Sequence, residues 1–179
     1  MAKSNTLLFE SYEPEFLVTE CPSCYDVFKS VYPKLFRKPN YKVIHISELL
    51  KELLDSGKLK VGKGECAKKI IYKDPCPLVR RHGITEEPRQ IVAQYAELLE
   101  FDSNRMELLC CGAPAGVKPL FPNIANRIAE MLNSEAAVKG ADEIAVSCVF
   151  CMYHMGGASK EKTPLIRTLS QEIKEHLKG

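Results

Sequence analysis

Short apolar runs end at cysteines at four widely separated places in this 179-residue chain. The cysteines concerned are Cys21, Cys76, Cys110 and Cys148. Short apolar runs predict strands, and the amphipathic stretches between them predict helices. The alternation therefore predicts an α/β fold, in which a mostly parallel sheet carries helices on both faces. Because ligands bind outside the carboxyl ends of the strands in such sheets, we expect the cysteines to gather at that edge.

The local pattern also predicts where the elements begin and end. Strands are expected at residues 16–19, 43–44, 70–72, 106–109 and 144–146. Pro22 predicts the first turn of a helix that Pro33 would end, and Ser47 predicts the cap of the next helix. A helix is expected to begin near Thr85, with a buried stripe reaching Leu99. Another is expected at Pro122, with Ile124, Ile128 and Leu132 on one face, and the last at 163–164.

Five of the eight cysteines form one long pattern, C-x33-C-C-G-x35-C-x2-C. Its members are Cys76, Cys110, Cys111, Cys148 and Cys151. A buried free cysteine packs as a small hydrophobe and has no reason to occur in pairs, whereas thiolate groups bind iron–sulfur clusters or zinc. Five thiols exceed by one the number that a tetrahedral zinc ion needs. The pattern therefore suits a multi-iron cluster, and a four-cysteine zinc site with a spare buried cysteine is the alternative.

Local geometry supports a shared centre. A Cys-x-x-Cys pair at the start of a helix brings two sulfurs to the same side, and the helix N-terminus favours the thiolate. Adjacent cysteines in an extended strand would point to opposite faces, so Cys110 and Cys111 can reach one centre only if the chain turns there. Gly112 permits such a turn.

The run from Lys73-Asp74-Pro75-Cys76 through Cys110-Cys111-Gly112 to Cys148-Val149-Phe150-Cys151 resembles the cysteine-rich CCG domain. That domain occurs in the B subunit of heterodisulfide reductase and in related iron–sulfur oxidoreductases. The resemblance divides the chain into residues 1–60, the remnant of a first CCG unit with its linker, and residues 61–179, a complete CCG domain.

The resemblance implies a noncubane 4Fe-4S cluster, held by the five cysteines of the pattern. It further implies an iron–sulfur oxidoreductase subunit that transfers electrons to or from a thiol/disulfide small molecule. Its implied partners are other heterodisulfide reductase-like subunits, which carry flavin and cubane iron–sulfur clusters.

This chain departs from the family pattern in its first unit. Only twenty residues precede Cys21, so that unit lacks its leading cysteine and its Cys-Cys-Gly. Cys21 and Cys24 are therefore expected to form a possible second, partial metal site, completed by a chain that supplies the missing half. Pro77 also stands where the family often has histidine.

Composition and the remaining cysteine set the other expectations. A net charge of +2 is too small to indicate nucleic-acid binding. The chain has no signal peptide pattern and no apolar run long enough for a transmembrane segment, so a cytoplasmic location is expected. Cys66 fits no motif, and a free thiol is its favoured interpretation. The alternative function, of a different class, is a zinc-binding structural or assembly subunit without redox activity.

Overall fold

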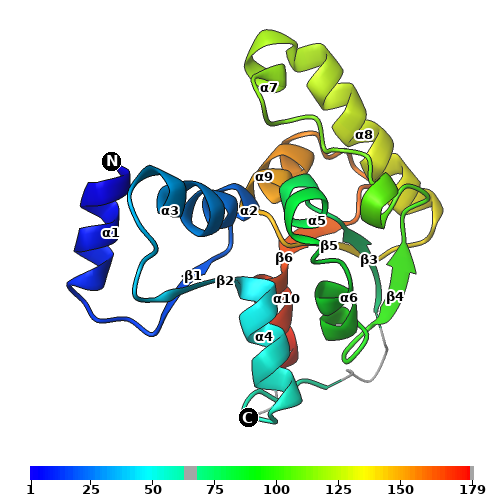
Figure 1. Cartoon of the computed structure of the whole chain (residues 1–179). Coiled ribbons are helices and arrows are strands. Elements are labelled where there is room, and N and C mark those ends of the chain that lie inside the picture. The colour runs from blue at the N-terminus through cyan, green and yellow to red at the C-terminus, as the bar shows by residue number, and fades with distance from the viewer. Residues whose placement is uncertain (63–67, 178–179) are drawn as a thin grey trace.

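The computed structural model describes residues 1–62 and 68–177 and confirms an α/β fold with parallel sheets. The larger sheet has the strand order β4-β3-β5-β6 (Figure 1). Its strands are β3 (Lys69–Lys73), β4 (Glu97–Glu100), β5 (Glu143–Val146) and β6 (Leu165–Thr168). A separate two-stranded parallel sheet pairs β1 (Phe16–Thr19) with β2 (Lys42–His45).

The helices alternate with these strands along the chain. The first half contains α1 (Ala2–Glu10), α2 (Pro22–Asp26), the π-helical segment η1 (Val27–Val31), α3 (Tyr32–Leu35), α4 (Ile46–Asp55), α5 (Cys76–His82) and α6 (Glu86–Val92). The second half contains the 3-10 segment η2 (Arg105–Glu107), α7 (Val117–Leu120), α8 (Pro122–Val138), α9 (Val149–Gly157) and α10 (Leu169–His176).

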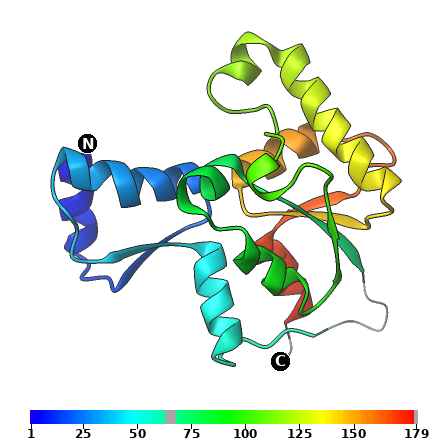
Figure 2. The same ribbon diagram turned by 45° about the vertical axis from the view of Figure 1, so that its right-hand side comes forward.

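Helices cover both faces of the larger sheet, as Figures 1 and 2 show. Side chains alternate across a strand, so Ile71 and Ile144 face α8 and α9, while Ile70 and Ala145 face α4, α6 and α10. All four of these side chains are fully buried. Burial on both faces explains why β3 and β5 are almost continuously apolar.

The two-stranded sheet and its helices pack against α5. Tyr25 and Val43 share a buried cluster with Leu78 of α5, and the Asp26 carboxylate pairs with Arg81 and with His82, whose Nε2 lies 3.0 Å away. This packing brings the end of β1 toward α5, which begins at Cys76.

Two local predictions in the N-terminal part are wrong. Pro33 does not end the helix that starts at Pro22, because α3 continues to Leu35 after the π-helical segment. Proline is tolerated there because it occupies the first turn of α3, where its missing N–H is not needed. The cap of α4 is His45, not Ser47, and Glu48 completes the capping box by accepting the His45 backbone N–H at 2.8 Å.

Three further predictions fail in the second half. The strand expected at 106–109 is β4 at Glu97–Glu100 instead, and Leu99 belongs to that strand and not to a helix. The helix expected to begin at 163–164 is preceded by β6 and begins at Leu169. Short apolar runs do not separate strand from helix by periodicity alone, which accounts for both errors. Ile124 is exposed, and α8 instead buries a stripe that includes Ala125, Ala129 and Leu132.

Within the described residues, no helix combines the length and apolar character needed to cross a bilayer. Cys66 lies outside the described residues.

Candidate metal centre

Three strands deliver cysteines to one edge of the structure, as the sequence predicts. Cys21 caps α2 after β1, Cys76 opens α5 after β3, and Cys148 caps α9 after β5. Cys110 does not directly follow a strand. β4 ends at Glu100, and the chain continues through η2 before it reaches Cys110 at the same edge. The expected strand directly before Cys110 is therefore replaced by a loop.

The five sulfurs of the sequence pattern form one continuous row. The Sγ atoms of Cys76 and Cys110 lie 3.7 Å apart, and the Cys151 thiol donates to Cys111 Sγ at 3.4 Å. Cys110 and Cys111 are adjacent in the chain and link these two pairs, and Cys148 precedes Cys151 by three residues at the start of α9. Cys111, Cys148 and Cys151 are buried, while Cys76 and Cys110 are half-buried. The five thiols thus follow one another along the row, whose end at Cys76 and Cys110 is reachable from solvent.

Gly112 makes the turn between the adjacent cysteines and α8. Its φ of +89° lies in the left-handed region, which residues other than glycine rarely adopt. A Cβ at this position would lie 3.1 Å from the carbonyl oxygen of Ala125 and 3.3 Å from Ile128 Cβ. Glycine is therefore required both by the backbone conformation and by the close approach of α8.

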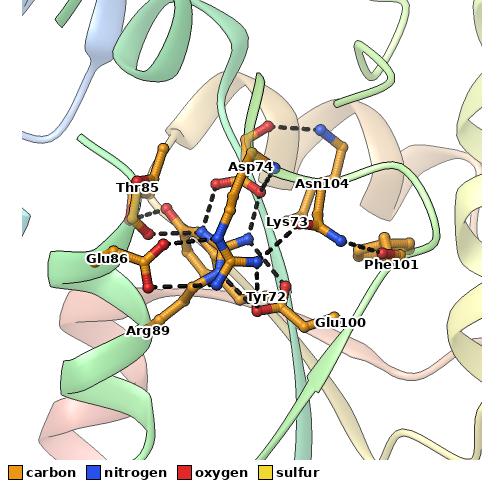
Figure 3. Close-up of polar contacts among 11 residues, drawn as sticks. Tyr72, Lys73, Asp74, Thr85, Glu86, Arg89, Glu100, Phe101 and Asn104 are labelled. Atoms are coloured by element: carbon orange, nitrogen blue, oxygen red, sulfur yellow. Dashed lines mark hydrogen bonds and ion pairs between the residues drawn. The ribbon is translucent and has the colours of Figure 1, made fainter. Parts of the chain in front are cut away.

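A buried ion pair fixes the turn that carries Cys76 (Figure 3). Arg89 donates to both carboxylate oxygens of Asp74, at 2.9 and 2.6 Å, and to both of Glu100, at 2.7 and 2.9 Å. The backbone N–H of Arg105 also donates to Asp74, at 2.9 Å. Asp74 thus joins the β3 end, two residues before Cys76, to the segment that leads to Cys110.

The pKa values of the thiols in the row are shifted in different directions. Hydrogen bonds from Cys111 and Cys76 hold the pKa of Cys110 far below its usual range, with the nearby ammonium of Lys73 as a smaller cause. The hydrogen bond from Cys151 lowers the pKa of Cys148 to about 7, helped by the backbone N–H groups at the start of α9. Sulfur neighbours and burial raise the pKa values of Cys76 and Cys151. The row therefore favours thiolates at Cys110 and Cys148.

Cys21 and Cys24 face the same edge but stand apart from the row. Cys24 is exposed and Cys21 is half-buried. Burial of its sulfur raises the pKa of Cys24, and the neighbouring Cys21 and the charge of Cys148 raise it further. Within the described residues, no hydrogen bond joins the sulfur of Cys21 or Cys24 to the row.

A cleft opens beside Cys76, between α2 and α5. It has a volume of about 470 Å³. Its lining comprises Ser23, Asp26, Val27, Cys76, Pro77, Arg80, Arg81, Pro114 and Ala115. The half-buried end of the sulfur row thus faces a cavity large enough for a small molecule.

The donor set fits a thiolate-ligated metal centre. No group of three or more His, Cys, Asp or Glu side chains in residues 1–62 and 68–177 is arranged to hold a single metal ion. The five sulfurs are instead spread along a row, with contacts between Cys76 and Cys110 and between Cys111 and Cys151. Sequence reasoning missed Lys73, a buried lysine at the end of β3, although a lysine that continues an apolar run three residues before Cys76 is the signal that points to it.

The chain is similar to known proteins along most of its length. A family model described as the cysteine-rich (CCG) domain matches residues 1–29 and 70–156. The chain is 30% identical over 154 residues to the D subunit of the dihydromethanophenazine:CoB–CoM heterodisulfide reductase of Methanosarcina acetivorans, an alignment covering 84% of this chain and 37% of that protein. It is 29% identical to a probable iron–sulfur-binding oxidoreductase, FadF, of Bacillus subtilis, over 90% of this chain and 23% of that protein.

A third relative is the B subunit of the fumarate reductase (CoM/CoB) of Methanothermobacter marburgensis, with 30% identity over 87% of this chain and 30% of that protein. The chain therefore spans 23 to 37% of the length of these three relatives. Among solved structures, an aspartate racemase homologue from Pyrococcus horikoshii aligns with a TM-score of 0.38 at 12% identity, over 95% of this chain and 70% of that one, and a likeness this weak assigns no function. The family model covers well over half of the residues, so the chain belongs to the cysteine-rich (CCG) domain family.

Proposed function

We propose that this chain is an iron–sulfur oxidoreductase subunit, resembling the B subunit of heterodisulfide reductase, that transfers electrons to or from a thiol/disulfide small molecule. Cys76, Cys110, Cys111, Cys148 and Cys151 would hold the cluster, which we propose to be of the noncubane 4Fe-4S type. When bound, such a cluster would supply the single electrons needed to cleave or form a disulfide bond. The observation that carries the proposal is the continuous row of five sulfurs at one sheet edge.

The spacing within the row supports more than one metal ion. Two thiolates on one tetrahedral metal ion lie about 3.8 Å apart when each metal–sulfur bond is ~2.3 Å. The separations of 3.7 Å between Cys76 and Cys110 and of 3.4 Å between Cys111 and Cys151 are close to that value. Two such pairs in series, with Cys148 as a fifth donor, suit a polynuclear cluster better than a single ion.

The chain's own residues would position the substrate at the cleft. Cys76 is the only pattern cysteine that lines it among the described residues, so a small disulfide bound there would lie at the half-buried end of the row. Arg80 is exposed on the cleft wall, while Arg81 is paired with Asp26. An anionic group on the substrate would therefore meet Arg80 first. The inner faces of α8 and α9 cover the other end of the row, where Cys111, Cys148 and Cys151 are buried, and would exclude water there.

We propose that the subunit works within a complex. The relatives named above include subunits of multi-subunit reductases. Partners with flavin and cubane iron–sulfur clusters would exchange electrons with the row, and a partner chain would complete the partial site at Cys21 and Cys24. The proposed division into residues 1–60 and 61–179 is compatible with the two segments that the family model matches. A cytoplasmic location completes the proposal.

Anaerobic reconstitution of the full chain with iron and sulfide tests the function. About four irons per chain and brown colour are expected, since thiolate-ligated clusters absorb in the visible range. Cys148→Ser should lose most of this iron, because a hydroxyl replaces thiolate poorly, whereas Cys66→Ser, outside the five-cysteine pattern, should keep it. A colourless protein that takes up zinc would instead support the structural or assembly function, and equal iron in both variants would overturn the ligand assignment.

A further inference from the structure

Lys73 places an ammonium group inside the protein next to the sulfur row. Lys73 is 1% exposed, and its side chain is among the largest fully buried side chains of the described residues. Lysine is almost never fully buried unless its charge is compensated, because removing an ammonium from water costs several kcal/mol. Its Nζ donates to the backbone carbonyl of Asp74 at 2.6 Å, which fixes the ammonium beside the turn that carries Cys76 (Figure 3).

Within residues 1–62 and 68–177, no carboxylate is paired with this charge. Among the described residues, Lys73 takes part in no ion pair, although the neighbouring Asp74 is paired with Arg89. Both oxygens of Asp74 already accept hydrogen bonds from Arg89, and one also accepts the Arg105 backbone N–H. In the part of the chain that the structure describes, Arg89 and its carboxylate partners therefore form a network of their own, and the Lys73 ammonium has no carboxylate counter-charge.

The strand geometry directs Lys73 toward the thiols. Lys73 is two residues after Ile71, so its side chain lies on the same sheet face as α8, α9 and the buried Cys111, Cys148 and Cys151. In the parallel register Lys73 lies opposite Val146, two residues before Cys148. Consistent with this position, the Lys73 charge acts on the thiols of Cys76, Cys110 and Cys148. The negative charges that it can balance are those of the thiolates.

We propose that Lys73 is the fixed counter-charge of the five-cysteine row and a positioning residue that raises the reduction potential of the cluster bound there. The inference rests on the proposed function, since it concerns the cluster that this function requires. A fixed positive charge in a low-dielectric site stabilises the state that carries the additional electron. Removal of the charge should therefore make the cluster harder to reduce.

The test compares the midpoint potentials of reconstituted wild type, Lys73→Met and Lys73→Arg. Lys73→Met preserves the length and apolar stem of the side chain and should shift the potential downward. Lys73→Arg keeps the charge, so its midpoint potential should stay close to that of wild type. Lys118→Met is the matched control, because Lys118 is a half-buried lysine over the Tyr153 ring of α9, at 4.9 Å, where solvent screens its charge. A potential in Lys73→Met equal to that of wild type would overturn the proposal.

A second measurement needs no cluster and separates the two proposals. If wild type binds no iron, the proposed function fails, and the reduced metal-free proteins are compared for their rate of alkylation by iodoacetamide at neutral pH. Only thiolates react, so Lys73→Met should react several-fold more slowly than wild type and than Lys118→Met. Equal rates would overturn the role of Lys73. Should Lys73→Met fail to fold by circular dichroism, Lys73→Gln is measured in both experiments and decides the outcome by the same criteria.

Discussion

Arg89 and Asp74 form a bidentate ion pair in the interior, with N–O distances of 2.9 and 2.6 Å. Both side chains are almost completely buried. Asp74 stands two residues before Cys76, the first cysteine of the row. Because Asp74 also accepts the backbone N–H of Arg105, one carboxylate fixes the two chain segments that lead to Cys76 and Cys110. The 3.7 Å separation of those two sulfurs therefore depends on an ion pair that contains neither cysteine.

Asp74→Asn should destabilise the fold and weaken iron binding together. The change leaves the Arg89 guanidinium without Asp74, the buried one of its two carboxylate partners, and breaking a buried pair in this way costs about 3–5 kcal/mol. Chemical denaturation of the metal-free protein and iron content after reconstitution measure the two effects. Glu86→Gln is the control, since Glu86 pairs with Arg105 at the surface, where such pairs contribute about 0–1 kcal/mol. Similar losses in both variants would contradict the role of the buried pair.

Gly112→Ala should destabilise the protein more than the same change at Gly83. Both glycines have positive φ, +89° and +68°, so each substitution brings backbone strain on the order of 1–3 kcal/mol. Only at Gly112 would the new Cβ also meet backbone, at 3.1 Å from the Ala125 oxygen; nothing described lies within 4 Å of a Cβ at Gly83. Thermal unfolding and iron content should both separate the two variants. Equal behaviour would show that the close approach of α8 is unimportant.

Replacing Cys21 and Cys24 together by serine should leave the iron content of the isolated chain unchanged. Neither sulfur contacts the row, and Cys24 interacts with Cys148 through its charge alone. Iron analysis of the double variant beside Cys148→Ser checks the assignment of the five-cysteine site. If the double variant lost as much iron as Cys148→Ser, Cys21 and Cys24 would have to be ligands of the same centre.

Glu172→Gln should stabilise the protein at alkaline pH and have less effect at acidic pH. Glu172 and Glu143 are 0% and 5% exposed, and burial, followed by the neighbouring Glu143 carboxyl group, raises the pKa of Glu172 from 4.5 to about 8. Below pH 4.5 Glu172 is protonated in both the folded and the unfolded chain. As the pH rises to about 8, the unfolded chain releases this proton and the folded chain does not, so the free energy of unfolding falls.

Glutamine carries no such charge, so the variant should gain stability over wild type by an amount that grows through this window, on the order of 1–3 kcal/mol. Thermal unfolding at pH 5 and pH 8.5 measures it, at values chosen to span most of the window. Glu175→Gln is the control on the same helix, since Glu175 is half exposed and pairs with Arg167 at 3.1 Å. A gain that does not depend on pH would contradict the raised pKa of Glu172.

The sequence predicted the parts of the fold that local chemistry decides. The strands at Phe16–Thr19, β3 and β5 are correct, because each is a short apolar run bounded by turn residues and followed by a cysteine. The sequence did not predict β4 or β6, because Leu98, Leu99 and Leu165 fit a helix as well as a strand. It therefore also failed to predict the loop before Cys110. Strand pairing between residues far apart resolved that ambiguity, and periodicity within one segment could not.

The sequence by itself determined which cysteines belong together, since the spacing of five thiols and the glycine after the adjacent pair are local features of the chain. Only the tertiary structure decided the order of the sulfurs in the row, the bond between Asp74 and Arg89, and the burial of Lys73 beside the thiols. These features depend on strand register and on contacts between residues 15 to 40 positions apart. Such contacts form only when the sheet assembles, because the free energy that stabilises them comes from burial and not from the propensity of any one segment.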